Sequence, residues 1–176
     1  REKELVDKLH IQATTDQLTG IFNRRVVFDA LDEAMENANE SQDREFTTIM
    51  FDIDFFKQVN DTYGHAGGDA VLISFAKLLE SEITSPNIVG RIGGEEFLAI
   101  LYLNQDQAAE FCKKLIIKIN DNTVNFEGID IKISSSGGVA FSSETNTSAD
   151  LTNKADERLY EAKKSGRNRF KLIDSE

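Results

Sequence analysis

Acidic residues stand at the ends of two apolar runs in this sequence, where carboxylates can take part in phosphate chemistry. Asp52-Ile53-Asp54 follows the β-branched and aromatic run 46–51, and Lys57 comes shortly after it. A strand holds the acid at its end rigidly at the rim of a sheet, and the amides of the turn that follows can point at an anion. Carboxylates gathered near such amides and a lysine suit a Mg²⁺ ion that carries a triphosphate.

A second acidic pair, Glu95-Glu96, follows Gly93-Gly94 between the apolar runs 87–92 and 97–103. Two glycines between such runs predict a tight hairpin, because both can adopt positive φ. Neighbouring residues on a strand face opposite sides, so the two glutamates are not expected to share one role unless the turn twists them together. One of the two glutamates would lie beside Asp52 if the strand that ends at Asp52 and the strand that follows the hairpin turn are neighbours in the sheet. The alternatives are a plain turn for the first acidic segment and a solvated loop tip for the second.

Polar residues also recur near the C-terminus of the chain. Asp156, Tyr160, Lys163 and Arg167 follow one another at intervals of four, three and four, which predicts one shared helical face. Such a face is either solvated, with ion pairs along the helix, or it presents Lys163 and Arg167 to phosphates.

Composition narrows the class of protein. The chain has 176 residues, enough for one domain, and a net charge of −11, which argues against a general nucleic-acid binder. The single cysteine, Cys112, excludes a disulfide framework, and His10 and His65 are too few for a histidine-based metal site. The sequence contains no P-loop motif and no run of about 18 apolar residues, so a P-loop enzyme and a membrane helix are disfavoured.

Hydrophobic periodicity predicts the elements that position these residues. Helices are expected over 1–12, 24–39, 55–61, 68–83, 105–122 and 148–165. Strands are expected over 46–52, 87–92, 97–103 and 170–173, and 129–141 is either a strand pair or one long bent strand. Hairpins mixed with crossover helices favour an α/β (α+β) fold, in which helices pack on a mixed, largely antiparallel central sheet.

Five blocks of the sequence resemble the GGDEF domains of bacterial diguanylate cyclases, in the order of that family. The blocks are 16–25, 52–57 with its continuation to 69, 91–97, 136–140 and 155–168. The third block holds the family signature in its Glu-Glu form, GGEEF. The resemblance implies a five-stranded, mostly antiparallel sheet flanked by helices, like that of class III nucleotidyl cyclases and polymerase palm domains. It also implies an enzyme that condenses two GTP molecules into cyclic di-GMP and releases two pyrophosphates.

The resemblance assigns roles to individual residues. Asp52, the carbonyl of Ile53 and the hairpin glutamates would hold Mg²⁺ or Mn²⁺, with two metal ions in each half-site. Glu95 is the candidate for metal ligand and general base, and Glu96 for a second metal-site carboxylate, although the sequence does not decide between them. The phosphates would be held by the amides of Phe55 and Phe56 and by Lys57, Lys163 and Arg167. Guanine would be read by Asn60 and Asp69, with His65 lining the same pocket.

The family also implies partners. Each domain holds one GTP, so turnover requires a homodimer, and we expect residues 1–13 to be a helical linker remnant and 14–176 to be the catalytic domain. The full-length protein would also contain an upstream sensory domain. We expect the catalytic domain to be cytoplasmic, and the parent protein can be attached to a membrane. We expect no nucleic-acid partner and no direct membrane contact. The alternative is a catalytically silent GTP-binding regulatory module.

One departure from the family pattern concerns product inhibition. Many members carry an Arg-x-x-Asp site for the product shortly before the signature. The matching stretch here runs from Thr84 to Asn87, so both charged residues are missing. We therefore expect no inhibition through that site.

Asp69 provides a first test of the guanine assignment. A carboxylate accepts hydrogen bonds from the ring N–H and the exocyclic amine of guanine, and adenine presents no such pair of donors on that edge. A buried acceptor left unpaired costs about 1–3 kcal/mol. Asp69→Ser is therefore expected to relax the preference for GTP over ATP by roughly ten- to a hundredfold, measured as the ratio of kcat/KM values. An unchanged ratio would contradict the assignment.

Overall fold

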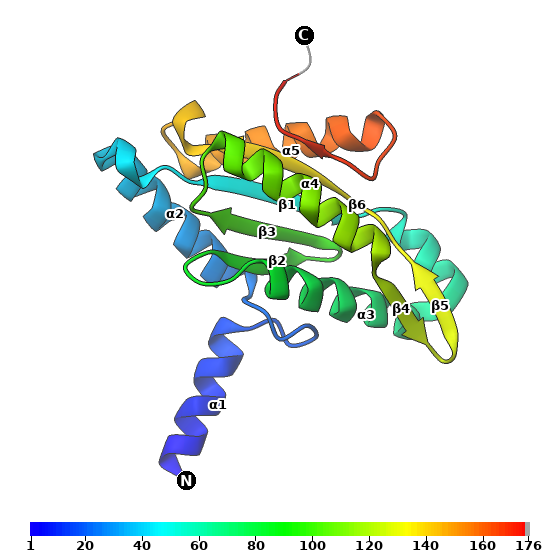
Figure 1. Ribbon diagram of the computed structural model, residues 1–176. Helices are drawn as coiled ribbons and strands as arrows, with labels where there is room; N and C mark the ends of the chain where they lie inside the picture. Colours follow the sequence, from blue (N-terminus) through cyan, green and yellow to red (C-terminus); the bar gives the residue numbers. More distant parts are fainter. Residues whose placement is uncertain (175–176) are drawn as a thin grey trace.

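A five-stranded sheet forms the centre of the computed structural model, which describes residues 1–174 (Figure 1). The strand order is β2-β3-β1-β6-β7. β1 (Thr47–Ile53) lies in the middle and pairs antiparallel with β3 (Glu96–Leu101) and β6 (Ser135–Phe141). β2 (Ile88–Gly93) pairs antiparallel with β3, and β7 (Phe170–Lys171) pairs parallel with β6. The predicted mixed, mostly antiparallel five-stranded sheet is therefore confirmed.

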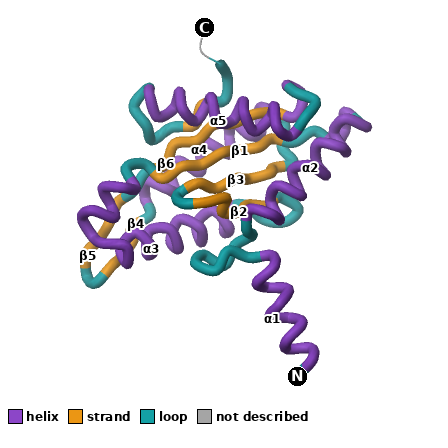
Figure 2. The backbone as a smooth tube through the Cα atoms, turned by 180° about the vertical axis from the view of Figure 1, so that it is seen from behind, coloured by secondary structure: helices purple, strands orange, loops and turns teal. Residues whose placement is uncertain are grey.

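Helices cover both faces of this sheet (Figure 2). One face packs against α2 (Arg24–Glu40) and α5 (Ser148–Lys164), and the other against α3 (Phe56–Glu82) and α4 (Gln105–Asp121). α1 (Glu2–Thr14) projects from the body and buries none of its residues within the chain. A hairpin of β4 (Thr123–Phe126) and β5 (Ile129–Lys132) stands beside the sheet, and the short 3-10 helices η1 (Gln42–Arg44) and η2 (Ser142–Glu144) flank β1 and β6.

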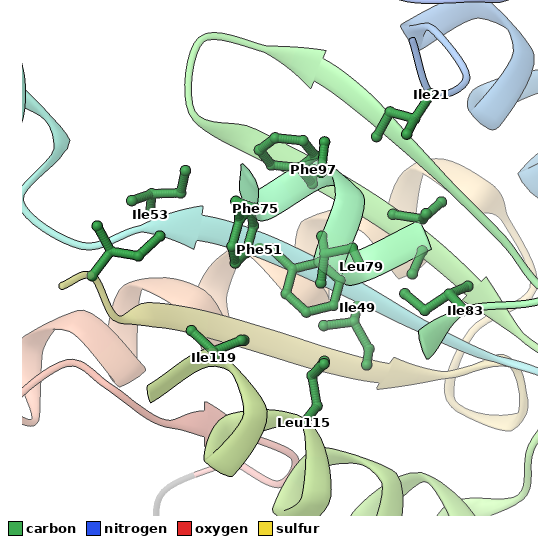
Figure 3. Packing of buried hydrophobic residues seen from close by; sticks show 14 of the residues in the cluster. Ile21, Ile49, Phe51, Ile53, Phe75, Leu79, Ile83, Phe97, Leu115 and Ile119 are labelled. Atoms are coloured by element: carbon green, nitrogen blue, oxygen red, sulfur yellow. The ribbon is translucent and has the colours of Figure 1, made fainter. Parts of the chain in front are cut away.

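β1 is buried along its whole length, and its side chains alternate between the two layers. Ile49, Phe51 and Ile53 pack with the residues of α3 and α4, where the rings of Phe51 and Phe75 meet edge to face (Figure 3). Met50 packs in the other layer with α2 and α5. The same alternation directs Asp52 toward the layer that contains α5.

The structure differs from the expected elements in two places. The helices expected over 55–61 and 68–83 are joined in α3, with a break at Gly64, whose φ of 73° and ψ of 175° are not helical. Of the two alternatives for residues 129–141, two strands hold rather than one bent strand, but β5 pairs with β4, which the sequence did not predict, and not with β6. β4 is only four residues long, and its pattern is too short for periodicity to detect.

No helix within residues 1–174 is long and apolar enough to cross a membrane. Residues 175 and 176, the end of the expected catalytic domain, lie outside the described residues.

Gly138 on β6 sets how closely α5 approaches the sheet. A Cβ at this position would overlap backbone atoms of Ala155 and Leu159, whereas a Cβ at Gly137 would meet only the ring of Phe170. Gly138→Ala is therefore expected to lower the free energy of unfolding by about 1–3 kcal/mol or more, because a packed helix must shift. Gly137→Ala is the matched control, with a smaller loss, since Phe170 lies on a two-residue edge strand. Urea unfolding measures both, and equal losses would contradict this view of the packing.

Candidate functional site

The register of β1 brings carboxylates from two strands together. Asp52 lies directly opposite Glu96 on β3 and Ser136 on β6. Asp52 is buried, at 4% exposure, whereas Glu96 lies at the exposed beginning of its strand. The question that the sequence left open is answered here, since the two strands that carry the acids are direct neighbours.

The hairpin turn carries Glu95 to the same place. Gly93 and Gly94 both have positive φ, 150° and 50°, as the expected tight turn requires. The carbonyl of Glu95 then accepts a hydrogen bond from the amide of Ile53 at 3.3 Å. The charge of Glu95 contributes to raising the pKa of Asp52, so this glutamate acts on the strand-end aspartate.

Lys163 on α5 neutralises part of this cluster. Its Nζ donates to Oδ2 of Asp52 at 2.6 Å, and the lysine side chain is 29% exposed. The pKa of Asp52 is nevertheless raised, chiefly because burial disfavours its charged form, with Lys163 opposing that effect. Burial also raises the pKa of Glu96, and the negative charges of Asp52 and Asp156 add to it. Asp156 on α5 therefore faces the cluster as a further acid, with its own pKa raised by burial.

Asp54 has a different part from Asp52. Its carboxylate accepts hydrogen bonds from the hydroxyls of Ser134 and Ser136, both at 2.6 Å, and from the amide of Asn168 at 2.9 Å. With its side chain fully buried and its lone pairs engaged, Asp54 ties the end of β1 to β6 and to the segment after α5. Of the two aspartates, Asp52 is therefore the one whose carboxylate faces the hairpin glutamates.

The turn after β1 leads directly into a helix. Phe55 adopts a left-handed conformation with φ 55° and ψ 33°, and α3 begins at Phe56. The first amides of α3, including those of Phe56 and Lys57, therefore lack partners within the helix and can receive an anion. Lys57 lies exposed in this first turn, as the sequence suggested.

Arg167 reaches this turn by an unexpected route. α5 ends at Lys164, and Arg167 follows in a left-handed conformation with φ 63°, so the prediction that it shares one helical face with Asp156, Tyr160 and Lys163 is wrong. Its guanidinium lies 4.6 Å from the centre of the Phe55 ring, and its Nη1 lies 4.0 Å from Asp54. Arg167 and Lys163 therefore flank the end of β1 from the same side.

The residues expected to read guanine lie on both sides of the break in α3. Asn60 precedes Gly64, and His65 and Asp69 follow it. A Cβ at Gly68 would overlap the side-chain amide of Asn60, so the small residue allows this amide to lie against the second half of the helix. His65 and Asp69 are exposed.

Sequence reasoning missed one contact of the site. Nε of Arg91 donates to the carbonyl of Gly94 at 2.9 Å, and its Nη1 contacts Asp16, with 3.2 Å to Oδ2. The only available signal was that both residues belong to the blocks that carry the family resemblance. Nothing in their spacing along the chain indicates that they meet.

The donors present suit a hard divalent cation. Asp52 and the hairpin glutamates offer carboxylate oxygens, and burial raises the pKa of Asp52 and Glu96. Within the part of the chain that the structure describes, however, no three Asp, Glu, His or Cys side chains gather closely enough to form a metal-ligand group. A cation at Asp52 must compete with the ammonium of Lys163.

Proteins of the GGDEF family are similar to this chain in sequence and in fold. The profile of the diguanylate cyclase GGDEF domain matches residues 13–169. The chain is 36% identical over 165 residues to diguanylate cyclase DgcS of Shewanella oneidensis, covering 94% of the chain and 54% of that protein. It is also 36% identical over 163 residues to diguanylate cyclase A of Treponema denticola, covering 90% and 44%. The chain thus spans about half the length of the curated relatives it matches.

Solved structures agree with these relatives. The coiled coil and GGDEF domain of DgcB from Caulobacter crescentus, in complex with c-di-GMP, gives a TM-score of 0.89 at 28% identity, covering 98% of this chain and 92% of that one. Diguanylate cyclase SiaD of Pseudomonas aeruginosa, solved with its activator SiaC, gives 0.87 at 33% identity, covering 98% and 66%. The fold expected from the sequence is therefore confirmed.

The ion pair between Lys163 and Asp52 makes a prediction about stability. Lys163→Met is expected to raise the pKa of Asp52 further, because the opposing positive charge is lost. A raised folded pKa means that the folded state binds the proton more readily, so stability falls as pH rises through the window above the ordinary carboxyl value. The variant should therefore lose about 1–2 kcal/mol at neutral pH, less than for a fully buried pair because Lys163 is partly exposed.

Urea unfolding across this pH range measures the effect. The loss should shrink as the pH falls toward the ordinary carboxyl pKa, where a protonated Asp52 no longer needs the ammonium. Lys164→Met is the matched control, since Lys164 is exposed and lies over the ring of Tyr160 at 6.0 Å. A loss that is independent of pH, or equal in the two variants, would contradict the prediction.

Proposed function

The chain belongs to the GGDEF family of diguanylate cyclase domains, and on this premise we propose that it condenses two GTP molecules into cyclic di-GMP. One observation carries the proposal. A buried aspartate at the end of β1 lies opposite a glutamate of the signature hairpin, and a lysine and the start of a helix lie beside them. This arrangement combines ligands for cations with donors for phosphates around one point.

The reaction transfers a nucleotidyl group twice. In each half, the 3′-oxygen of one GTP bonds to the α-phosphorus of the other, and the bond to the bridging oxygen breaks to release pyrophosphate. Asp52, the carbonyl of Ile53 and the hairpin glutamates would hold Mg²⁺ or Mn²⁺, two in each half-site. Such ions would supply positive charge against the charge that builds on the phosphate oxygens. Glu95 takes the proton of the 3′-hydroxyl, and Glu96 completes the carboxylate cluster.

We infer that Lys163, which pairs with Asp52, gives its ammonium to a phosphate oxygen when nucleotide and its counter-ions bind. Arg167 exchanges its place over the Phe55 ring for a second phosphate. The amides of Phe55 and Phe56, with Lys57, bind at the start of α3.

Guanine lies at the break in α3. Asn60 and Asp69, on either side of the break at Gly64, would read the base edge, and His65 would line the same pocket. The carboxylate of Asp69 favours guanine over adenine.

Turnover requires two copies of the domain, because each holds one of the two nucleotides. The apolar residues of α1, Leu5, Val6, Leu9 and Ile11, are between 55% and 61% exposed in this chain. Leu5 and Leu9 lie one turn apart and give a second copy of α1 a surface for helix pairing. Residues 1–13 then act as the link to an upstream sensory domain in a cytoplasmic parent protein. Linkage of this kind raises the effective concentration of the two half-sites.

Product inhibition through an Arg-x-x-Asp site is not part of this proposal. Thr84 and Asn87 occupy the matching positions between α3 and β2. The side chain of Asn87 instead accepts from the amide of Tyr102 at 2.8 Å, a structural contact beside the end of β3.

Product analysis tests the proposal. The domain is incubated with GTP and Mg²⁺, both alone and fused to a dimerising coiled coil, and the products are separated by chromatography. We expect cyclic di-GMP and pyrophosphate, formed faster by the fused form because pairing is enforced. The variant with Glu95→Ala and Glu96→Ala is the control and should be inactive. A forced dimer that binds GTP without turnover would instead support the silent regulatory module.

A further inference from the structure

Arg24 on α2 and Arg91 on β2, the first strand of the hairpin itself, both donate hydrogen bonds to the signature turn. Nη1 of Arg24 donates to the carbonyl of Ile92 at 3.1 Å, and Nε of Arg91 donates to the carbonyl of Gly94 at 2.9 Å. These carbonyls belong to the residues on either side of Gly93. The turn that precedes Glu95 and Glu96 is therefore held at two points by guanidinium groups.

The turn has little else to hold it. A Cβ built at Gly93 or Gly94 would have no other atom within 4 Å, so the turn packs against nothing on that side. The pairing of β2 with β3 also shifts register between Arg91 and Gly93, which leaves Ile92 as an extra residue in the ladder. Glycines at positive φ add backbone freedom. Apart from the contacts of Glu95 and Glu96 with β1, the two guanidinium hydrogen bonds are thus the restraint on the turn that precedes these carboxylates.

Arg91 is itself fixed in orientation. Its Nη1 contacts both oxygens of Asp16, at 3.3 and 3.2 Å, and the two side chains are only 16% and 21% exposed. Asp16 in turn accepts from the amide and the hydroxyl of Thr19, at 2.9 and 2.7 Å. The forked guanidinium spans from this anchor to the turn, a geometry that a lysine cannot reproduce.

The backbone between α1 and α2 supports both arginines. The amide of Arg91 donates to the carbonyl of Phe22 at 2.9 Å, and Phe22 bridges Gly90 in parallel. Arg24 is the first residue of α2 and directly follows the helix-capping Asn23. The segment between α1 and α2 therefore positions the guanidinium of Arg24 and holds the backbone of Arg91.

We propose that Arg91 and Arg24 are positioning residues, which fix the signature turn so that Glu95 and Glu96 stand at the correct distance from Asp52. The inference rests on the proposed function for the role of these carboxylates, but the restraint on the turn does not. Neither arginine touches the reacting atoms. A displacement of about 1 Å at a reacting group can cost on the order of a hundredfold in rate.

Arg91→Met and Arg24→Met test the proposal, with Arg25→Met as the matched control. Arg25 neighbours Arg24 on the same helix and is exposed, but it binds the carbonyl of Ala13 and Asp29 rather than the turn. The first readout is hydrogen exchange in nucleotide-free protein. The amide of Ile53 donates to the carbonyl of Glu95 and reports directly on the turn.

We expect the Ile53 amide to exchange about tenfold faster in Arg91→Met and less so in Arg24→Met, with the centre of β1 unchanged. In the dimeric form, kcat should fall roughly ten- to a hundredfold, and KM for GTP should stay within about twofold because the guanine and phosphate groups are untouched. Arg91→Lys should recover only part of kcat, since one ammonium cannot span both partners. Arg25→Met should match the wild type.

Two results would overturn the proposal. One is faster exchange spread evenly along β1 and β3, which indicates general destabilisation. The other is exchange at Ile53 equal to that of the wild type. Because the exchange experiment needs no turnover, it tests the restraint even if the chain proves inactive and the proposed function fails.

Discussion

The pairing of β1 with β3 is the constraint on which the site depends, because it fixes a buried carboxylate directly opposite another one. Asp52 and Glu96 cannot separate without breaking the central ladder of the sheet. Burial raises the pKa of both groups, the charge of Glu95 adds to the effect on Asp52, and the charge of Asp52 adds to the effect on Glu96, so ionising them in the folded chain costs free energy. Perturbed pKa values of this kind cluster at functional sites.

The helix that compensates this charge is itself firmly anchored. Gly138 allows the backbone of α5 to approach β6 closely. Arg158, only 3% exposed, donates to the carbonyl of Val139 and forms a bidentate pair with Glu144. Because these contacts fix α5 along the strand, Lys163 reaches Asp52 from a defined position. The packing of α5 against β6, far from the carboxylates, therefore determines that Lys163 is the cation that contacts Asp52.

Local patterns in the sequence predicted much of this arrangement, and contacts across the fold explain what they missed. The Gly93-Gly94 turn and the acid at the end of β1 follow from short-range rules, and they are confirmed. The separate task of Asp54 does not, because its partners Ser134 and Ser136 lie about eighty residues away in the chain. The route of Arg167 depends on where α5 ends, and helix boundaries are the least reliable part of a sequence-based prediction.

We propose that Asp52 and the hairpin glutamates hold a divalent metal ion beside bound nucleotide. Crystals of the domain grown with Mn²⁺ and a GTP analogue that cannot react would test it most directly, through anomalous scattering at the manganese edge. We predict an anomalous peak between Asp52 and the signature turn, with the ammonium of Lys163 moved from the carboxylate to a phosphate oxygen. Bound nucleotide without such a peak, with Lys163 still on Asp52, would contradict it.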